Sequence, residues 1–457
     1  MNTIKFVHGI LKKHPIVTTV ICWLLLSFIG AYAFYLRYPY AYNHANFYAE
    51  DGTVWLRNIL NEGPIKAMAT LFNGYLVVGQ YMVAEFAMLI NAMFGKGFET
   101  IPKAFAVASY LFWGVVCSLP YLLFKKRMGL ILALLTVCLL LIVPLGGYDY
   151  VAIGTIGNLK FAFLFITALL VTYRNQNDLA KYNWQFALID LTLLLCVLTN
   201  IISIALLPFA LLRYKKEIKL LFIKWRSFLK SLTFQHYSLI SLFVICTAYV
   251  VAVYIKGIPK IPGYLDGPLL PGSLIAIIYR GSIYGLLFPI NILMNNIIAI
   301  VLIISVLTAA FFNKYRYILL FFIVAILINV FGFVFNRPGI THSFLTYDSD
   351  GGPGFFFYAG TMIFVFAVMY AIQDWFKIQT HFSKTILSAV VIGYAIIVVP
   401  MSGSRGASYE VILSKRPTMS VEVKRVCSTN TGNTVEMGIY PADIWTLTLK
   451  RSQVCSE

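Results

Sequence analysis

The chain has 457 residues, of which 60% are hydrophobic and only 12% are charged. A soluble domain carries roughly 25% charged residues, so this composition excludes an ordinary water-soluble enzyme. The apolar residues fall in blocks of about 20, the length of a helix that spans a bilayer. In a soluble chain, the net charge of +18 would suggest a nucleic-acid partner. In a membrane protein, basic residues are enriched in the cytoplasmic loops, so their distribution between the two sides has to be considered first. We expect a polytopic membrane protein whose partner is the lipid bilayer and not nucleic acid.

The first apolar run, residues 16–34, follows Lys5, Lys12 and Lys13, which predicts a cytoplasmic N-terminus. The triplet Ala31-Tyr32-Ala33 resembles a signal-peptidase site, so cleavage there is the alternative to an uncleaved first helix. Further spans are expected near residues 105–124, 129–144, 159–173, 239–254, 292–312, 318–335, 355–370 and 386–400.

Two apolar segments do not fit a simple alternation of spans. Residues 186–212 contain Thr199-Asn200 at their middle and are followed by basic residues, which predicts two short helices that dip into the membrane and return. Residues 75–94 include Glu85. A full span there would place the basic cluster 125–127 outside, so we expect a helix on the outer face or dipping into it. The prediction is about eleven membrane helices in an all-α fold, with the N-terminus inside and the C-terminus outside.

In this topology the cytoplasmic loops hold about half of the 36 basic residues and few of the 18 acidic ones. The acidic residues therefore lie toward the outside, where we expect the polar chemistry. The predicted organisation is a transmembrane domain over residues 1–401 and an outer C-terminal domain over 402–457. The outer loops of the first domain are expected at residues 37–100, with surface helices, at 257–291 and at 336–354.

The cysteines support an outer C-terminal domain. Of the 7 cysteines, five lie in apolar runs, where a thiol packs as a small hydrophobic group. Cys427 and Cys455 lie in the hydrophilic tail, and an oxidising exterior favours a disulfide between them. Residues 421–424 and 445–449 alternate between apolar and polar side chains, as strands do. We expect a small disulfide-bonded β unit outside the membrane.

The first outer loop carries two adjacent carboxylates, Glu50 and Asp51, directly ahead of an amphipathic stretch over 54–71. Carboxylates at the membrane surface, next to the end of a span, suit a general base or a metal ligand. In the alternative interpretation Asp51 caps a helix and Glu50 is a solvated loop residue.

The later outer loops offer further polar groups. The second loop places Asp149, Asn158 and Lys160 at the mouth of two spans. The fourth contains Asp348-Ser349-Asp350, whose spacing lets two carboxylates hold one divalent cation, although a glycine-rich loop with this pattern is also typical of a turn.

Three basic residues at the outer mouths, Lys160, Arg280 and Arg337, are candidates for holding a phosphate at headgroup depth. The alternative is that they extend toward lipid phosphates at the interface without a specific ligand.

These features together resemble the polytopic GT-C fold glycosyltransferases, which take a sugar from a polyprenyl-phosphate carrier at the outer face of the membrane. The architecture matches over most of the chain. The residues that carry the closer likeness, to bacterial and phage O-antigen (serotype-converting) glucosyltransferases, are Phe47-Tyr48-Ala49-Glu50-Asp51-Gly52, Asn73-Gly74-Tyr75 and Gly157-Asn158.

The resemblance implies inverting transfer of a sugar, with glucose expected, to a cell-surface polysaccharide such as O-antigen. It implies a multi-pass protein of the bacterial inner membrane that works at the periplasmic face. Asp51 would be the catalytic base, with Glu50 second, and Lys160, Arg280 and Arg337 would hold the donor phosphate. The residues expected to contact substrate are Tyr48, Asp149, Asn158, Asp348 and Asp350.

No nucleotide-binding loop occurs in the sequence. The sequence does not decide whether a divalent cation, Mg²⁺ or Mn²⁺, is a cofactor, because the first loop lacks a strict Asp-x-Asp. The alternative functions are a flippase or transporter of lipid-linked sugars, which needs ionisable residues within spans, and a polysaccharide polymerase. Within the spans we find few such residues, chiefly Asp190 and Glu85, and this favours the enzyme.

Overall fold

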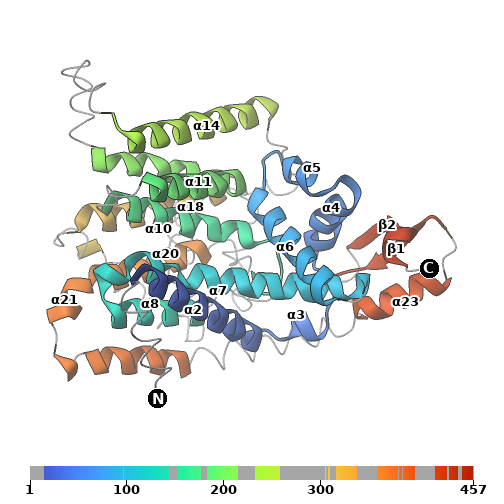
Figure 1. Ribbon diagram of the computed structural model, residues 1–457, viewed down its shortest axis with the longest axis horizontal. Coiled ribbons are helices and arrows are strands. Elements are labelled where there is room, and N and C mark those ends of the chain that lie inside the picture. Colours follow the sequence, from blue (N-terminus) through green and yellow to red (C-terminus); the bar gives the residue numbers. More distant parts are fainter. Residues whose placement is uncertain are drawn as a thin grey trace.

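The computed structural model describes residues 15–95, 97–143, 152–176, 183–214, 232–257, 304, 307–308, 315–336, 358–378, 380–382, 384–396, 417–429, 432–440 and 445–455. Most of these residues are helical, and the sheet they contain has two strands. Long helices lie roughly along the longest axis of the molecule, with short helices and the sheet gathered at one end (Figure 1).

The helices of the bundle are α2 (Pro15–Arg37), α7 (Ile101–Met128), α8 (Leu130–Ile142), α10 (Ala162–Gln176), α11 (Asn183–Thr199), η5 (Ile201–Tyr214), α14 (Phe234–Lys256), α18 (Arg316–Asn336) and α20 (Tyr358–Ala371). The short helices of the first loop are α3 (Tyr40–Asn43), η1 (Asp51–Leu56), α4 (Arg57–Glu62) and α5 (Pro64–Ala69), followed by α6 (Val78–Phe94) and η2 (Phe98–Thr100). The remaining short elements before the C-terminal unit are η3 (Leu159–Phe161) and α21 (Gln373–Ile378).

Among the described residues, 3 helices are long and apolar enough to cross a membrane: Ile16–Arg37, Phe98–Met128 and Phe234–Lys256. The middle one is the most enclosed, because 61% of its apolar window is buried against 17% and 22% for the others. Shorter apolar helices of 10–17 residues accompany them. These findings indicate a membrane protein built around α7, while about eleven spans and the GT-C fold stay predictions.

Two glycines let α2 pack closely on α7. A methyl group on Gly114 would overlap the carbonyl oxygen of Ser27, and one on Gly30 would lie 3.0 Å from the Gly114 Cα. The hydroxyls of Ser27 and Ser118 share a hydrogen bond of 2.8 Å across the same contact. Small residues and a buried hydroxyl pair are typical of helix contacts in membranes, where close packing replaces the hydrophobic effect.

The segment 186–212 forms a helical hairpin. Asp190 of α11 contacts Arg174 at the end of α10, whereas the Asn200 side-chain amide, between α11 and η5, donates to the Lys160 carbonyl oxygen at the start of α10. Arg213, at the end of η5, returns to donate to the Arg174 carbonyl oxygen. The predicted pair of short helices is confirmed, and its polar turn lies at the Lys160 side.

The bundle therefore has two distinct ends. We call the end that contains Asp51, Lys160 and Asn200 the Asp51 end, and the opposite one the Arg174 end. The Tyr358 hydroxyl, at the first residue of α20, donates to the Asn158 carbonyl oxygen at 2.7 Å, so α20 begins at the Asp51 end.

The C-terminal unit comprises α23 (Met419–Thr429), β1 (Thr434–Gly438), β2 (Thr446–Lys450) and α24 (Arg451–Val454). The strands are antiparallel, with Thr434 opposite Lys450. The strand prediction for 445–449 is confirmed by β2, but that for 421–424 is wrong because this segment lies in α23. Met419, Glu422 and Val426 are its buried residues, and this three-to-four spacing is that of one helical face.

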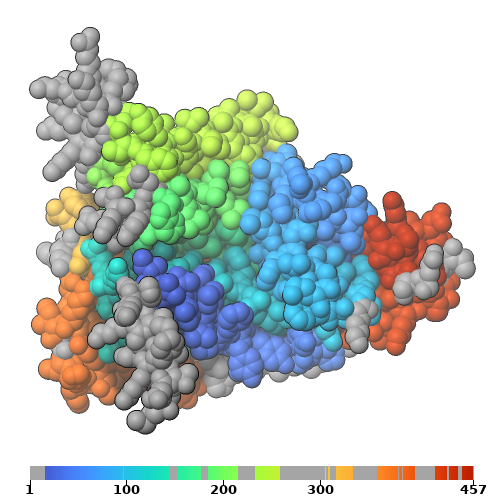
Figure 2. All heavy atoms as spheres, in the orientation of Figure 1, coloured from blue at the N-terminus to red at the C-terminus, as the bar shows by residue number. Residues whose placement is uncertain are grey.

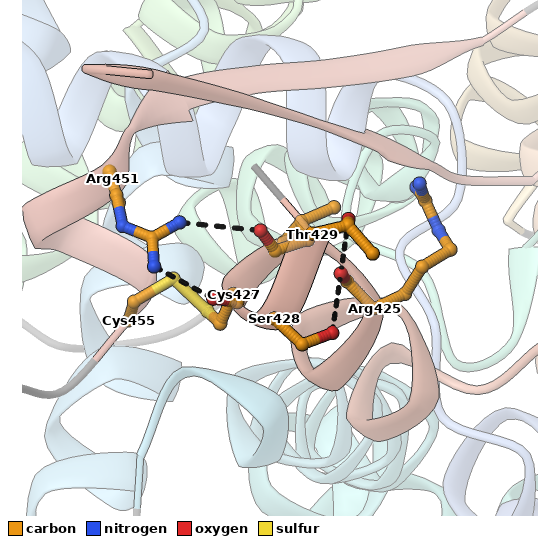
Figure 3. Close-up of a disulfide and its surroundings, with 7 residues drawn as sticks. Arg425, Cys427, Ser428, Thr429, Arg451 and Cys455 are labelled. Carbon is orange, nitrogen blue, oxygen red and sulfur yellow. Dashed lines mark hydrogen bonds between the residues drawn. A yellow bond between two sulfur atoms is a disulfide. The ribbon is translucent and has the colours of Figure 1, made fainter. Parts of the chain in front are cut away.

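The predicted disulfide between Cys427 and Cys455 is present, with Cα atoms 5.7 Å apart. It joins α23 to the residue after α24, and the Arg451 guanidinium donates to the Cys427 and Val426 carbonyl oxygens beside it at 2.7 and 3.3 Å (Figure 3). The unit lies against the first-loop segments at the Asp51 end (Figure 2).

Candidate functional site

The segment 45–49, ahead of the two carboxylates, is held by the C-terminal unit. The amides of Met419 and Tyr440 donate to the carbonyl oxygens of Ala45 and Phe47, each at 2.9 Å, and the Ala49 amide donates to Tyr440. Tyr48 forms a parallel bridge with Tyr440. Tyr48, predicted to bind substrate, is therefore a half-buried residue of this junction.

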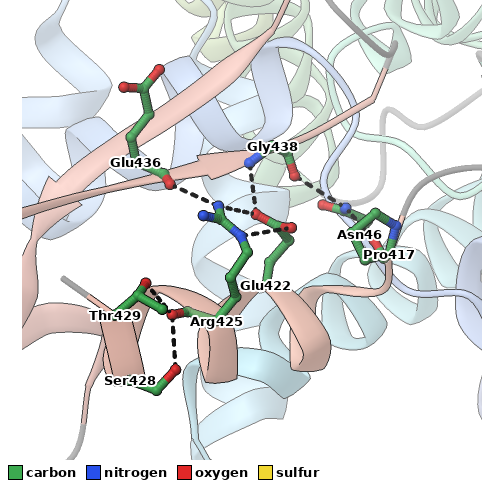
Figure 4. A network of polar contacts seen from close by, with 8 residues as sticks. All are labelled: Asn46, Pro417, Glu422, Arg425, Ser428, Thr429, Glu436 and Gly438. Atoms are coloured by element: carbon green, nitrogen blue, oxygen red, sulfur yellow. Dashed lines mark hydrogen bonds and ion pairs between the residues drawn. The ribbon is translucent and has the colours of Figure 1, made fainter.

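A polar network reinforces the junction (Figure 4). The Asn46 side-chain amide donates to the carbonyl oxygens of Pro417 and Gly438, at 3.0 and 3.3 Å. The Glu422 carboxylate accepts from the Gly438 amide at 3.1 Å and from Arg425 at 2.7 Å. Backbone hydrogen bonds from Met419 and Tyr440, together with the side chain of Asn46, thus fix the chain immediately before Glu50.

The backbone turns sharply at Ala49, whose φ is 41°. A non-glycine residue in this left-handed region is uncommon and costs on the order of 1 kcal/mol or more, so it persists only where surrounding contacts hold it. The hydrogen bond from Ala49 to Tyr440 is one such contact. The turn starts η1 at Asp51.

The Asp51 carboxylate is 3% exposed and bonds to the second loop. Its Oδ1 accepts from the amides of Ile156 at 3.0 Å and Gly157 at 2.8 Å, and its Oδ2 lies 3.1 Å from the Ile156 nitrogen. The N-cap position of η1 is Glu50, and no side chain caps it. The interpretation of Asp51 as a cap of its own helix is wrong, because its carboxylate binds backbone that is 105 residues away in sequence.

Burial raises the pKa of Asp51 to about 8. The amides of Gly157 and Ile156 oppose this effect by favouring the charged form, and the neighbouring Glu50 charge adds to it. A carboxyl whose pKa lies near neutrality can both take up and release a proton under physiological conditions.

Gly157 brings three polar side chains together. A methyl group placed on it would have as nearest neighbours Asp51 Oδ1 at 3.5 Å, Trp55 Nε1 at 3.6 Å and Glu50 Oε2 at 3.7 Å. Glu50 is half-buried, so it lies beside Asp51 at the same point of the second loop. The structure thus brings both predicted catalytic carboxylates to the Gly157-Asn158 motif.

Gln80 of α6 reaches the same glycine from the other side. Its Nε2 donates to the Gly157 carbonyl oxygen at 2.9 Å, and the residue is fully buried. The preceding Gly79 amide donates to the Thr199 hydroxyl at 2.8 Å, beside the turn of the α11–η5 hairpin. α6, the second loop and the hairpin therefore meet at one point.

Lys160 lies in η3 and is only 8% exposed. Its ammonium lies over the rings of Phe72, 4.9 Å from the centroid, and Phe161, at 5.3 Å. No carboxylate of the described residues forms an ion pair with it. A largely buried cation that has aromatic contacts but no ion-pair partner can bind an anionic ligand.

The aromatic rings connect Lys160 to the carboxylates. Phe72 lies 5.1 Å from the ring of Trp55, measured between centroids, and Trp55 lies 5.1 Å from that of Tyr81. The indole nitrogen of Trp55 lies beside Gly157, which the Asp51 carboxylate also contacts. A series of contacts through Phe72 and Trp55 therefore links the cation to the acid at the Asp51 end.

Asn158, the other predicted substrate residue among those described, is half-buried and lies between Gly157 and η3. Five predicted site residues fall outside the described residues; they are Arg280, Arg337, Asp149, Asp348 and Asp350.

Three site residues escaped sequence reasoning: Trp55, Gln80 and Tyr358. A signal for Gln80 was present, since the apolar run 75–94 contains only two side-chain amides, Gln80 and Asn91. Trp55 and Tyr358 look like interfacial aromatics in the sequence. Only their contacts in the structure, Trp55 with Gly157 and Tyr358 with Asn158, distinguish them from other interfacial aromatic residues.

Among the described residues, no group of three or more His, Cys, Asp or Glu side chains is close enough to hold a metal ion. Glu50 and Asp51 could contribute two oxygens, and the Asp348-Ser349-Asp350 motif lies outside the described residues, so the cation prediction stays untested.

Comparison of the sequence with protein-family models gave no match. Comparison with curated proteins gave none either. A functional proposal therefore rests on the chemistry of the site and on the resemblance of the short sequence motifs described above.

Proposed function

We propose that this protein transfers a sugar from a polyprenyl-phosphate carrier to a hydroxyl of a cell-surface polysaccharide such as O-antigen. The observation that carries the proposal is the presence, at the same end of the bundle and linked by aromatic contacts, of a buried carboxyl with a raised pKa and a buried lysine without an anionic partner among the described residues. Such a transfer needs a base for the acceptor and a cation for the departing phosphate.

In this mechanism the Asp51 carboxylate takes the proton of the acceptor hydroxyl. The acceptor oxygen attacks the anomeric carbon of the donor, a new glycosidic bond forms, and the bond from that carbon to the phosphate oxygen breaks. The electron pair leaves with polyprenyl phosphate, whose added charge Lys160 offsets. A pKa of about 8 makes Asp51 a stronger base than an ordinary carboxylate.

Glu50 has a separate role in the proposal. It is half-buried beside Asp51 and contributes to the raised pKa of that residue. Its negative charge also stabilises the positive charge that develops on the sugar ring as the phosphate leaves. The Glu50→Gln variant is therefore expected to lose transfer as well.

The proposed orientation puts the Asp51 end at the periplasmic face of the bacterial inner membrane. The disulfide of the adjacent C-terminal unit supports this, because disulfides persist in oxidising compartments. The basic cluster 125–127 at the end of α7 supports it too, since Phe124 packs on Tyr173 next to Arg174, at the opposite end. Basic residues are enriched on the cytoplasmic side.

A flippase or transporter of lipid-linked sugars is the competing function. It would require a titratable group within the bundle that can exchange a proton or ion. Two candidates lie among the described residues. Asp190 forms an ion pair with Arg174 through both its oxygens, and one of them also accepts from Ser238, which favours a structural role. Glu85 of α6 is half-buried with one carboxyl oxygen that has no hydrogen-bond partner, so the flippase alternative rests on this residue alone. The enzyme has both a candidate base and a candidate phosphate-binding cation and is the better proposal.

The proposal is tested by sugar transfer in membranes that contain the protein. Radiolabelled glucose on polyprenyl phosphate is the first donor and lipopolysaccharide the acceptor. The Asp51→Asn variant should lose about 10²- to 10⁴-fold in rate, the range for removal of a general base. Glu62→Gln, an exposed carboxyl of α4 in the same loop, is the matched control and should retain the wild-type rate.

Equal rates for Asp51→Asn and wild type, at equal protein levels, would contradict the role of Asp51. Failure of the wild type with glucosyl, galactosyl and N-acetylglucosaminyl donors would contradict glycosyl transfer and favour the flippase.

A further inference from the structure

The segment 45–61 carries both candidate catalytic carboxylates, and the C-terminal unit holds it at its first end. The backbone amides of Met419 and Tyr440 donate to carbonyl oxygens within residues 45–47. Ala49, with its left-handed φ of 41°, donates back to Tyr440. The C-terminal unit therefore fixes the direction in which the chain enters η1.

The same unit also holds the far end of this segment. The Gln453 side chain, in α24, donates from Nε2 to the Leu60 carbonyl oxygen and to Asn61 Oδ1 of α4, each at 3.2 Å. Its Oε1 accepts from the Lys450 amide at 3.0 Å and so caps α24. Gln453 thus joins α24 to α4, the helix that follows η1.

Between these two attachments, η1 packs directly on the hairpin of the C-terminal unit. A methyl group on Gly52 would lie 3.1 Å from Phe47 Cβ, 3.2 Å from Ile439 Cδ1 and 3.4 Å from Leu447 Cδ2. Ile439 follows β1, and Leu447 lies in β2. The residue after Asp51 is therefore in closer contact with this unit than a side chain would ordinarily allow.

The disulfide joins the two attachments to each other. Cys427 lies in α23, which begins at Met419, and Cys455 follows α24, which contains Gln453. The Arg451 guanidinium adds two hydrogen bonds from α24 to carbonyl oxygens of α23 (Figure 3). The covalent link limits how far the two attachments can separate.

We propose that the C-terminal unit positions the catalytic carboxylates by holding the segment 45–61 at both ends, with Gln453 as a positioning residue, an inference that rests on the proposed function. A catalytic group acts within a narrow range of positions, and a displacement of about 1 Å can cost on the order of 10²-fold in rate. The Asp51 carboxylate bonds the amides of Ile156 and Gly157 at 3.0 and 2.8 Å. Release of α4 from Gln453 would let η1 move away from these amides.

The test uses two variants of Gln453 in membranes that contain the full chain. Gln453→Glu keeps an oxygen that accepts from the Lys450 amide but has no N–H for the Leu60 carbonyl oxygen, whereas Gln453→Met loses both bonds. Both should lower kcat on the order of 10-fold and leave the KM for polyprenyl-phosphate glucose within about twofold. Ser452→Glu, which adds the same charge at an exposed position of α24, is the matched control and should keep the wild-type rate.

A second readout separates positioning from a loss of folded protein. If Gln453 acts through Asp51, Gln453→Glu should not lower the residual rate of the Asp51→Asn variant any further, because the base is already absent. A variant that only reduced the amount of folded enzyme would lower that residual rate by the same factor as the wild-type rate.

A third readout does not depend on activity. Hydrogen exchange at the Ile156 and Gly157 amides, which bind the Asp51 carboxylate, should become faster in Gln453→Glu and Gln453→Met. In Ser452→Glu it should stay as in the wild type.

Three results would overturn the inference while the wild type transfers sugar. They are a wild-type kcat in both Gln453 variants, an equal fractional loss with and without the Asp51→Asn change, and unchanged exchange at Ile156 and Gly157. A wild type that transfers none of the donors would contradict the proposed function instead. In that case the exchange measurement decides whether the C-terminal unit positions Asp51.

Discussion

The two ends of the helical bundle bury charge in opposite ways. At the Arg174 end, Arg174 and Asp190 form a bidentate pair with N–O distances of 2.7 and 3.0 Å, and their side chains are 0% and 5% exposed. The remaining guanidinium nitrogen, Nη1, donates to the Tyr214 hydroxyl, and Nη2, which also bonds Asp190, donates to the Gln235 carbonyl oxygen. The pair joins α10, α11, η5 and α14 (Figure 1).

At the Asp51 end the buried polar groups are incompletely bonded. Lys160 has no acidic partner among the described residues, and the Trp55 nitrogen and Gln80 oxygen have no hydrogen bond. A saturated network contributes to the structure and has no capacity left for a ligand. Lys160, which has no acidic partner among the described residues, keeps that capacity. The contrast between a paired and an unpaired buried cation supports the proposal that the Asp51 end is the functional one.

The largest effect on stability is expected at the Arg174 end. Asp190→Ala leaves Arg174 buried without its anion and should destabilise the protein by about 3–5 kcal/mol. Thermal unfolding in detergent measures this loss. Lys377→Ala is the control, since its pair with Asp374 is 3.8 Å long and about half exposed, and it should change stability by less than about 1 kcal/mol. Equal small effects would show that the Arg174 network is not structural.

Loss of the disulfide should affect the Asp51 end alone. The bond links residues 28 apart, so the double variant Cys427→Ser with Cys455→Ser is expected to destabilise the C-terminal unit by about 3 kcal/mol. Hydrogen exchange should become faster at Ala49, Met419 and Tyr440, whose amides hold the junction, and transfer should decline. Faster exchange throughout α10 would contradict a local effect.

Lys160→Met should have the smallest effect on stability and a clear effect on activity. Methionine keeps contact with Phe72 and Phe161 and removes a buried charge that has no acidic partner among the described residues, so the unfolding temperature should be unchanged or higher. Transfer should fall about 10- to 100-fold, the value of one or two charge-assisted hydrogen bonds to phosphate. Lys66→Met, an exposed residue of α5, is the control. A fall in stability with unchanged transfer would contradict the phosphate role.

The helical class and several local elements could be predicted from the sequence, because apolar runs, breaks and isolated cysteines in a polar tail are local signals, whereas about eleven spans and the GT-C fold stay predictions. The hairpin with its turn at Asn200, the strand β2 and the disulfide follow from them. The strand prediction at 421–424 was wrong because four residues of alternation cannot be told from part of a helical face.

The candidate site was predictable only in part. The residue types of Asp51, Glu50 and Lys160 attracted attention, but their grouping depends on bonds such as that between Asp51 and Gly157, which are 106 residues apart. Trp55 and Gln80 belong to the site through their contacts with Gly157, which lies far from both in the sequence.

The central claim, that Asp51 acts as the base of a glycosyl transfer, is tested most directly by the pH dependence of that transfer. Burial raises the pKa of Asp51 to about 8, and only its ionised form can take a proton. Below pH 8 the rate of the wild type should therefore rise about tenfold per pH unit and level off above it. In Asp51→Asn the residual rate should lack this rise. A wild-type rate that does not change between pH 6 and 8, or the same rise in Asp51→Asn, would contradict the account.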